Sequence, residues 1–112
     1  MTAANLFAAT VRSDSELVEE LAGRPGLRIE RIVSQGQASP PGFWYDQAED
    51  EWVALLSGAA RLEFADGRVR EMAAGDHVLL PAGLRHRVAW TDPGRQSVWL
   101  AVFWDPVGSA PG

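Results

Sequence analysis

A histidine next to a chain reversal is the clearest chemical feature of this sequence of 112 residues. The stretch Gly75–Trp90 holds a glycine turn, a short apolar run, a Pro-x-Gly corner and then His86. Because glycine and proline favour tight reversals, we expect His86 at the start of a strand, on the same face as Val88 and Trp90. An imidazole on this apolar face can serve as a metal ligand, a proton acceptor or a buried hydrogen-bonding group.

Glu51 is the second residue whose position suggests chemistry. It opens a predicted strand and shares a face with Val53 and Leu55. A carboxylate on an apolar face needs a partner to offset the loss of water. The alternation therefore predicts an inward Glu51, and the alternative is a surface charge beside Asp50.

The residue types present limit the other chemistry. The chain has no cysteine, and all ten of its basic residues are arginines. A thiolate nucleophile, a disulfide and lysine Schiff-base chemistry are therefore excluded, and any metal must bind to nitrogen and oxygen. No glycine-rich phosphate loop is present, so we expect no nucleotide cofactor. His77, the other histidine, opens the preceding strand and is expected near the surface or behind the site.

Four residues in the stretch Gly75–Trp90 have a specific spacing. Gly75, Pro81, Gly83 and His86 are separated by five, one and two residues. This spacing resembles the second conserved motif of the cupins, which normally continues to an asparagine where this chain has Trp90. The resemblance implies the cupin fold, a double-stranded β-helix or jelly-roll barrel.

The region upstream is similar to a degraded first cupin motif. Glu51, six residues and Gly58 fit its end, but the two histidines that should precede the glutamate are absent. In the family, these two histidines, the glutamate and the second-motif histidine converge on one divalent metal inside the barrel. The site implied by the resemblance is therefore incomplete here.

The positions of the missing histidines are open by one residue. Counting back from Glu51 with a four-residue spacing gives Trp44 and Asp46, whereas a three-residue spacing gives Tyr45 and Gln47. A shift of one residue moves every side chain of an extended segment to the opposite face. Trp44 could also fill the space that a ligand once occupied.

The resemblance implies a site in which Glu51 and His86 are metal ligands and catalytic residues, with Asp46 or Gln47 completing the ligand set. The expected cofactor is a divalent ion of iron, manganese, nickel or zinc. Nitrogen and oxygen donors of this kind favour the first three over a structural zinc. Metal would act on a small organic acid, phenol or sugar derivative, by oxygenase, isomerase, decarboxylase or lyase chemistry.

Trp44, Tyr45 and Trp90 are expected to shape the pocket for this small molecule. The alternative function is a metal-free cupin that binds or senses a small molecule without catalysis. Its support is the loss of both histidines of the first motif, together with Trp90 in place of asparagine.

Short alternating runs between turn signals predict an all-β barrel or sandwich. One exception is Ser13–Glu16, which has the spacing of a capping box and predicts a short helix over 14–22. We therefore expect an N-terminal arm and helix (1–26), a cupin barrel (27–105) and a flexible tail (106–112).

The composition is that of a globular protein, with 46% hydrophobic and 22% charged residues. The net charge of −5 argues against nucleic-acid binding, which needs a basic face. No stretch is long and apolar enough for a membrane, so we expect a soluble, cytoplasmic protein. The resemblance to cupins implies a homodimer, with residues 3–12 as a pairing arm.

Overall fold

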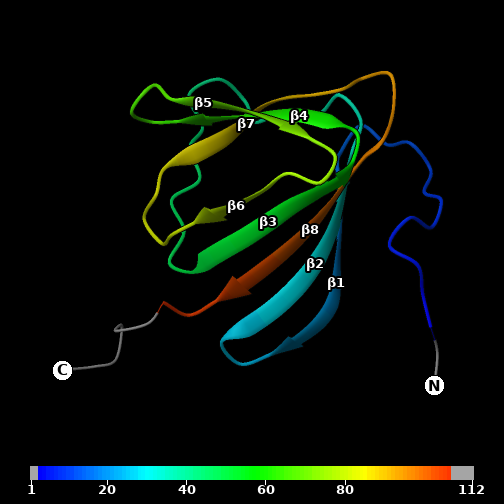
Figure 1. Cartoon of the computed structure of the whole chain (residues 1–112), viewed down its shortest axis with the longest axis horizontal. Coiled ribbons are helices and arrows are strands. Elements are labelled where there is room, and N and C mark those ends of the chain that lie inside the picture. The colour runs from blue at the N-terminus through cyan, green and yellow to red at the C-terminus, as the bar shows by residue number, and fades with distance from the viewer. Residues whose placement is uncertain (1–2, 107–112) are drawn as a thin grey trace.

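The computed structural model describes residues 3–106, which form two antiparallel sheets (Figure 1). The strands are β1 (Leu17–Arg24), β2 (Leu27–Ser34), β3 (Asp50–Ser57), β4 (Ala59–Phe64), β5 (Val69–Ala73), β6 (His77–Leu80), β7 (His86–Thr91) and β8 (Ser97–Trp104). The predicted all-β double-stranded β-helix is thereby confirmed. Most of the predicted tail, residues 107–112, lies outside the described part of the chain.

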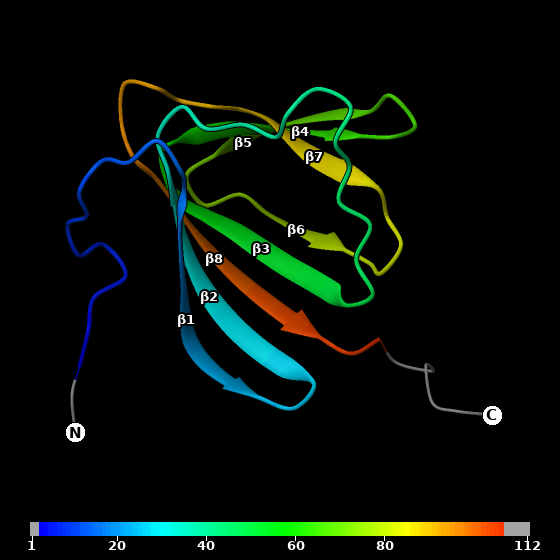
Figure 2. The same cartoon turned by 180° about the vertical axis from the view of Figure 1, so that it is seen from behind.

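The two sheets differ in size and curvature. The larger has the strand order β1-β2-β8-β3-β6 and the smaller the order β5-β4-β7. The smaller sheet lies over the β3 and β6 side of the larger one, whereas β1 and β2 curve away from it (Figures 1 and 2). The smaller sheet therefore does not cover β1 and β2, which border one end of the space between the sheets.

The core lies between the sheets and follows the alternation of the central strands. In β4, every second side chain is buried, and in β3 and β8 the fully buried residues include Leu55 and Ala101. Trp99 is only 4% exposed, as expected for a residue that fills the core. Because a strand buries alternate residues, these positions also fix which side chains of β3 and β8 face the interior.

The predicted helix over 14–22 is wrong, because this segment forms the edge strand β1. A tight turn with Gly26 in the left-handed region (φ 80°) joins β1 to β2, and the two strands pair along their length. The carboxylate of Glu16 does not cap a helix and instead accepts a hydrogen bond from the Ser34 hydroxyl at 3.0 Å. Pairing with β2 therefore outweighs the local helix signal.

In the part of the chain that is described, no helix is long and apolar enough to cross a membrane.

The motif glycine Gly58, which joins β3 to β4, is required by close packing against Ser97 at the start of β8. Its φ is +90°, and a Cβ atom added there would lie 2.5 Å from the Cα of Ser97. Gly75 also has a positive φ (+94°), but a Cβ atom there would meet nothing within 4 Å. Gly58 therefore combines a backbone and a packing requirement, whereas Gly75 has only the backbone requirement.

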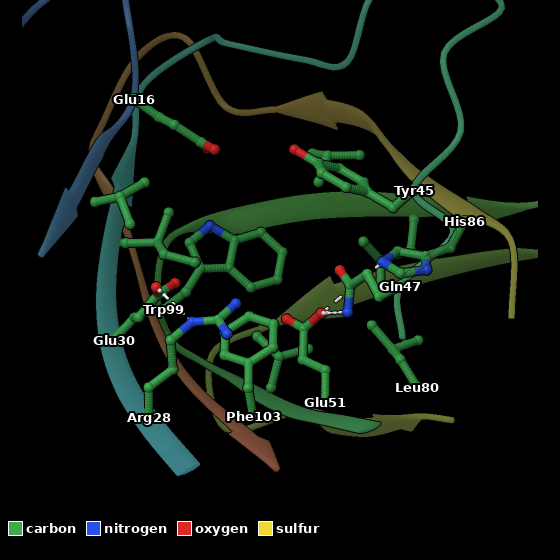
Figure 3. Close-up of a pocket in the computed structure, with 15 residues that line it drawn as sticks. Glu16, Arg28, Glu30, Tyr45, Gln47, Glu51, Leu80, His86, Trp99 and Phe103 are labelled. Atoms are coloured by element: carbon green, nitrogen blue, oxygen red, sulfur yellow. Dashed lines mark hydrogen bonds and ion pairs between the residues drawn. The ribbon is translucent and has the colours of Figure 1, made fainter. Parts of the chain in front are cut away.

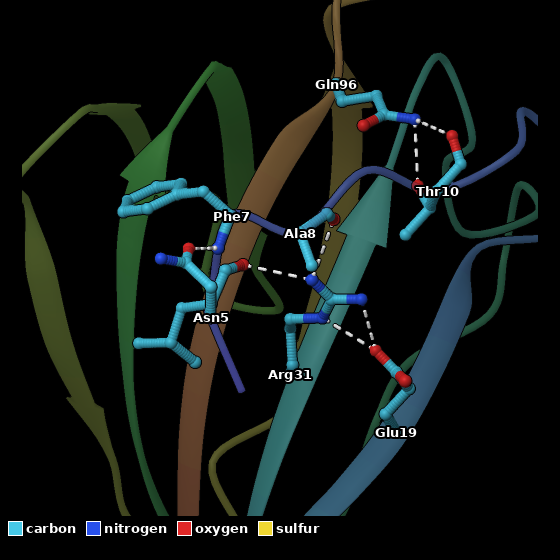
Figure 4. Close-up of polar contacts among 8 residues, drawn as sticks. Asn5, Phe7, Ala8, Thr10, Glu19, Arg31 and Gln96 are labelled. Atoms are coloured by element: carbon cyan, nitrogen blue, oxygen red, sulfur yellow. Dashed lines mark hydrogen bonds and ion pairs between the residues drawn. The ribbon is translucent and has the colours of Figure 1, made fainter. Parts of the chain in front are cut away.

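The N-terminal arm (residues 5–10) is irregular and is held to β2 by a buried arginine (Figure 4). Arg31 Nη1 donates hydrogen bonds of 3.1 Å to the carbonyl oxygens of Leu6 and Ala8. Its Nε donates to Glu19 at 2.6 Å, and the whole residue is 6% exposed. The arm is thus tied to the outer side of the larger sheet through one charged side chain.

Candidate functional site

A cavity of about 360 Å³ lies inside the barrel, between the two sheets. Figure 3 shows Gln47, Glu51 and His86 facing one another on one side of this cavity. The rings of Trp99 and Phe103 from β8 form part of its wall, and Phe103 is the cross-strand neighbour of Glu51. The arrangement places a small polar cluster against an apolar and aromatic surface.

The protonation of His86 follows from its contacts. Its Nδ1 lies 2.9 Å from the carbonyl oxygen of Leu84. Because a carbonyl can only accept, Nδ1 carries the hydrogen and Nε2 of the neutral ring holds a free lone pair. Burial lowers the pKa of His86, although the hydrogen bond to Leu84 acts in the opposite direction. The ring is therefore neutral near pH 7 and directs Nε2 into the cavity.

Glu51 lies at the start of β3 and is only 7% exposed. Its Oε1 accepts a hydrogen bond of 3.2 Å from Gln47 Nε2 and lies 3.9 Å from His86 Nε2, which is too long for a direct hydrogen bond. Burial raises the pKa of Glu51 from 4.5 to about 7, and the hydrogen bond from Gln47 offsets only part of that effect. A neutral imidazole and a carboxyl group poised near neutrality therefore face each other.

Main-chain hydrogen bonds fix the loop before β3 to the corner before β7. Tyr45 and His86 form an isolated antiparallel bridge, with N–H to carbonyl distances of 2.7 and 3.1 Å. The carbonyl of Gln47 accepts a hydrogen bond from the Gly83 N–H at 2.9 Å. The extended loop therefore turns Tyr45 and Gln47 towards the cavity, and the Tyr45 ring stacks on His86 with centroids 5.4 Å apart. These are the two positions given by the three-residue spacing.

Trp44 and Asp46 lie on the other side of the same loop. Neither lines the cavity, Asp46 is exposed, and the guanidinium of Arg85 lies 5.9 Å from the centre of the Trp44 ring. The reason is the alternation of an extended segment, which sends the neighbours of Tyr45 outward. The expectations that Asp46 ligates a metal here and that Trp44 shapes or fills this cavity are therefore corrected.

Trp90 is also outside the cavity, because a bulge interrupts β7. Val88 pairs with Leu62 but Trp90 pairs with the adjacent Arg61, so β7 contains one extra residue between them. A bulge of this kind reverses the faces of all later side chains. The Trp90 ring therefore lies outside the barrel, 5.6 Å from the Arg61 guanidinium, and does not shape the cavity as expected from the alternation.

Three charged residues of the cavity were not singled out from the sequence. Glu16 precedes β1, while Arg28 and Glu30 lie on the inner face of β2 (Figure 3). Arg28 donates to Glu30 at 3.0 Å and to Glu49 at 2.7 Å. The alternation of Arg28, Glu30 and an isoleucine along β2 could have indicated that these side chains share the face towards the cavity. No pattern in the sequence indicated the same for Glu16, because its segment resembled the start of a helix.

The side chains in the cavity do not complete a metal site. His86 and Glu51 are two strong donors, whereas catalytic metal centres usually have three protein ligands. The third candidate, Gln47, turns its N–H and not its oxygen towards Glu51. Tyr45 is a phenol whose pKa is raised by burial and by the nearby Glu16 and Glu51, which disfavours a phenolate ligand. Within residues 3–106, no three His, Cys, Asp or Glu side chains are grouped to hold a metal ion.

The chain belongs to the cupin family: the family model for the cupin domain matches residues 30–103. The match begins in β2 and ends in β8, and it includes Glu51, Gly58 and His86. The suspected small single-domain cupin is therefore confirmed as a fold and a family. No curated protein matches the chain.

Several solved structures are similar along almost the whole chain. A structure from Ralstonia eutropha JMP134, named a putative mannose-6-phosphate isomerase, is 52% identical, with 95% of this chain and 100% of that chain covered and a TM-score of 0.90. A cupin 2 conserved barrel domain protein from Salinispora arenicola CNS-205 is 29% identical, with 94% and 89% covered and a TM-score of 0.69. A conserved protein of unknown function from Streptococcus pyogenes is 23% identical, with 94% and 88% covered and a TM-score of 0.75, which supports the fold alone.

Proposed function

We propose that this cupin binds a small organic molecule inside its barrel through Glu51, Gln47 and His86, without a resident metal ion. The observation that carries the proposal is the polar cluster of Gln47, Glu51 and His86 in a cavity of about 360 Å³ that Tyr45, Trp99 and Phe103 also line. Pockets for small molecules typically have this composition, with apolar walls and a few convergent polar groups. The amide N–H of Gln47, the lone pair on His86 Nε2 and the Glu51 carboxyl offer both donors and acceptors.

The competing proposal is a divalent metal held by Glu51, His86 and Gln47. The unprotonated Nε2 of His86 and its distance of 3.9 Å from Glu51 Oε1 support it. The donor chemistry opposes it, because the two first-motif positions hold an amide and a phenol where imidazoles would give strong binding. We therefore favour the metal-free function.

A second candidate function is proton transfer on the bound molecule. Glu51, with a pKa of about 7, can give or take a proton near neutral pH, and the neutral His86 ring can accept one at Nε2. Isomerisation of a carbonyl compound requires this kind of acid and base, and the name of the Ralstonia protein suggests such a reaction. Binding is the broader proposal, since it holds with or without turnover.

Elemental analysis separates the metal-bound and metal-free proposals. Protein purified without a metal-binding tag is incubated with excess iron, manganese, nickel or zinc, and then freed of unbound metal. We expect substoichiometric metal both in the protein and in the variants His86→Ala and His77→Ala. Near-stoichiometric metal that disappears in His86→Ala but persists in His77→Ala would refute the metal-free proposal.

A fragment screen by ligand-observed NMR tests the binding itself. We expect fragments that bind the protein and lose affinity in His86→Ala but not in His77→Ala, because His77 lies outside the cavity and contacts Trp52. A screen in which no fragment distinguishes the two variants would contradict a binding role for this cavity.

A further inference from the structure

The charges around the cavity are unevenly matched. Three carboxylates line it, those of Glu16, Glu30 and Glu51, against one guanidinium, that of Arg28. Arg28 is already engaged with Glu30 at 3.0 Å and with Glu49 at 2.7 Å. Partial burial lowers its pKa, but the hydrogen bonds that it donates to these two carboxylates raise the pKa above the ordinary value, so Arg28 stays charged and paired. The cavity therefore keeps two carboxyl groups, those of Glu16 and Glu51, that form no ion pair with an arginine among the described residues, although the charge of Arg28 acts to lower the pKa of Glu51.

These two carboxyl groups point into the same space from different elements. Glu51 reaches in from β3, and its side chain is 9% exposed. Its Oε1 accepts a hydrogen bond from Gln47 and lies 3.9 Å from His86 Nε2, whereas Oε2 accepts no hydrogen bond from residues 3–106. Glu16 reaches in from the start of the larger sheet, opposite the Tyr45 hydroxyl (Figure 3), and is held by the Ser34 hydroxyl. A ligand that displaces water from the cavity must replace the hydrogen bonds that the water gives to these carboxylate oxygens, so a ligand that donates hydrogen bonds to them is favoured.

The walls between the two carboxyl groups are aromatic. Tyr45 lies on one side, and Trp99 and Phe103 lie on the other (Figure 3). One of these rings already binds a cation, because the guanidinium of Arg28 lies 4.0 Å from the centre of the Phe103 ring. Aromatic faces attract cations, most strongly where water is excluded. The aromatic wall therefore favours a cationic ligand, as the carboxyl groups do.

We propose that the natural ligand is an organic cation, with an amine, amidine or guanidine group between Glu51 and Glu16 and an apolar or aromatic body against Trp99. This inference rests on the proposed function, the binding of a small organic molecule without a resident metal. Anionic ligands such as phosphate esters are disfavoured, because the one guanidinium of the cavity is already paired with two carboxylates. The substrate in the name of the Ralstonia protein is therefore not the class of ligand that these charges select.

Three probes of nearly the same shape and different charge test the inference. Benzamidine is a cation, benzamide is neutral and benzoate is an anion, and each is titrated into the full chain by calorimetry or NMR. We expect benzamidine to bind at least about tenfold more tightly than benzamide, as for a hydrogen bond to a charged group, and benzoate to bind most weakly. Glu16→Gln and Glu51→Gln should each reduce the preference for benzamidine, with little change for benzamide.

The exposed Glu20, which lies outside this cavity, provides the matched control. Glu20→Gln removes the same charge from the chain, so a preference caused by net charge alone would fall equally in this variant, which would overturn the inference. Benzamide or benzoate binding as tightly as benzamidine would also overturn it while leaving the proposed binding function intact. If none of the three binds, the inference fails, and the fragment screen decides separately whether the proposed function fails with it.

Discussion

Replacing Glu51 with glutamine is expected to stabilise the protein at alkaline pH. The carboxyl group of Glu51 is buried, and its pKa in the folded protein is about 7 instead of 4.5. An acid whose pKa is raised by folding holds its proton more tightly in the folded state, so stability falls as pH rises between the two values. Below pH 4.5 both states are protonated and there is no penalty, whereas above pH 7 the folded state carries the full cost of a buried charge.

The two pKa values set the size of this effect. The difference between 4.5 and about 7 corresponds to about 3 kcal/mol at high pH. At about pH 5 less than about 1 kcal/mol of this penalty is present. The stability advantage of Glu51→Gln over the parent should therefore grow by about 2 to 3 kcal/mol between about pH 5 and about pH 8.5. His86 is present in both proteins, so the comparison with the parent subtracts its own titration.

Urea denaturation followed by tryptophan fluorescence measures the free energy of unfolding at each pH. The same measurement on Glu20→Gln, an exposed position, should give a difference from the parent that does not change with pH. Curves for Glu51→Gln and the parent that stay parallel from about pH 5 to about pH 8.5 would refute the reasoning. Such a result would mean that Glu51 titrates in the folded protein as it does in the unfolded chain.

The double variant Tyr45→His, Gln47→His should acquire a site for zinc or nickel, because it adds two imidazoles at positions that already face the cavity; calorimetry showing no metal binding by the folded double variant would contradict this placement. Gly58→Ala should destabilise the protein by more than about 3 kcal/mol and Gly75→Ala by about 1 kcal/mol, because an added Cβ atom meets the backbone of Ser97 only at position 58. Equal losses of stability for the two variants in thermal denaturation would be inconsistent with this difference. Arg31→Met should release the N-terminal arm, which faster amide exchange at Ala8 would reveal and unchanged exchange would argue against.

The second motif could be predicted in detail from the sequence because its geometry is local. The glycine and proline residues from Gly75 to Gly83 impose reversals that few other residues adopt, and they place His86 at a strand start. The inward position of Glu51 followed from the alternation with apolar neighbours. In both cases the information lies within a few residues of the side chain concerned.

The remaining features depend on contacts between distant segments. Nothing local in the segment 14–22 reveals that β2 offers it a pairing edge, so its helix signal was misleading. The bulge in β7 reverses Trp90 without any glycine or proline to mark it. The spacing before Glu51 could not be resolved by counting, because the answer depends on the backbone bridge between Tyr45 and His86.

That bridge separates the positioning of the site from its chemistry. The loop is held by main-chain atoms of Tyr45, Gln47, Gly83 and His86, and none of these hydrogen bonds involves a side chain. Mutations at positions 45 and 47 can therefore replace one set of functional groups by another while the backbone that presents them stays in place. A barrel built in this way can diverge in the molecules it recognises through single substitutions, with each intermediate in such an evolutionary path still folded.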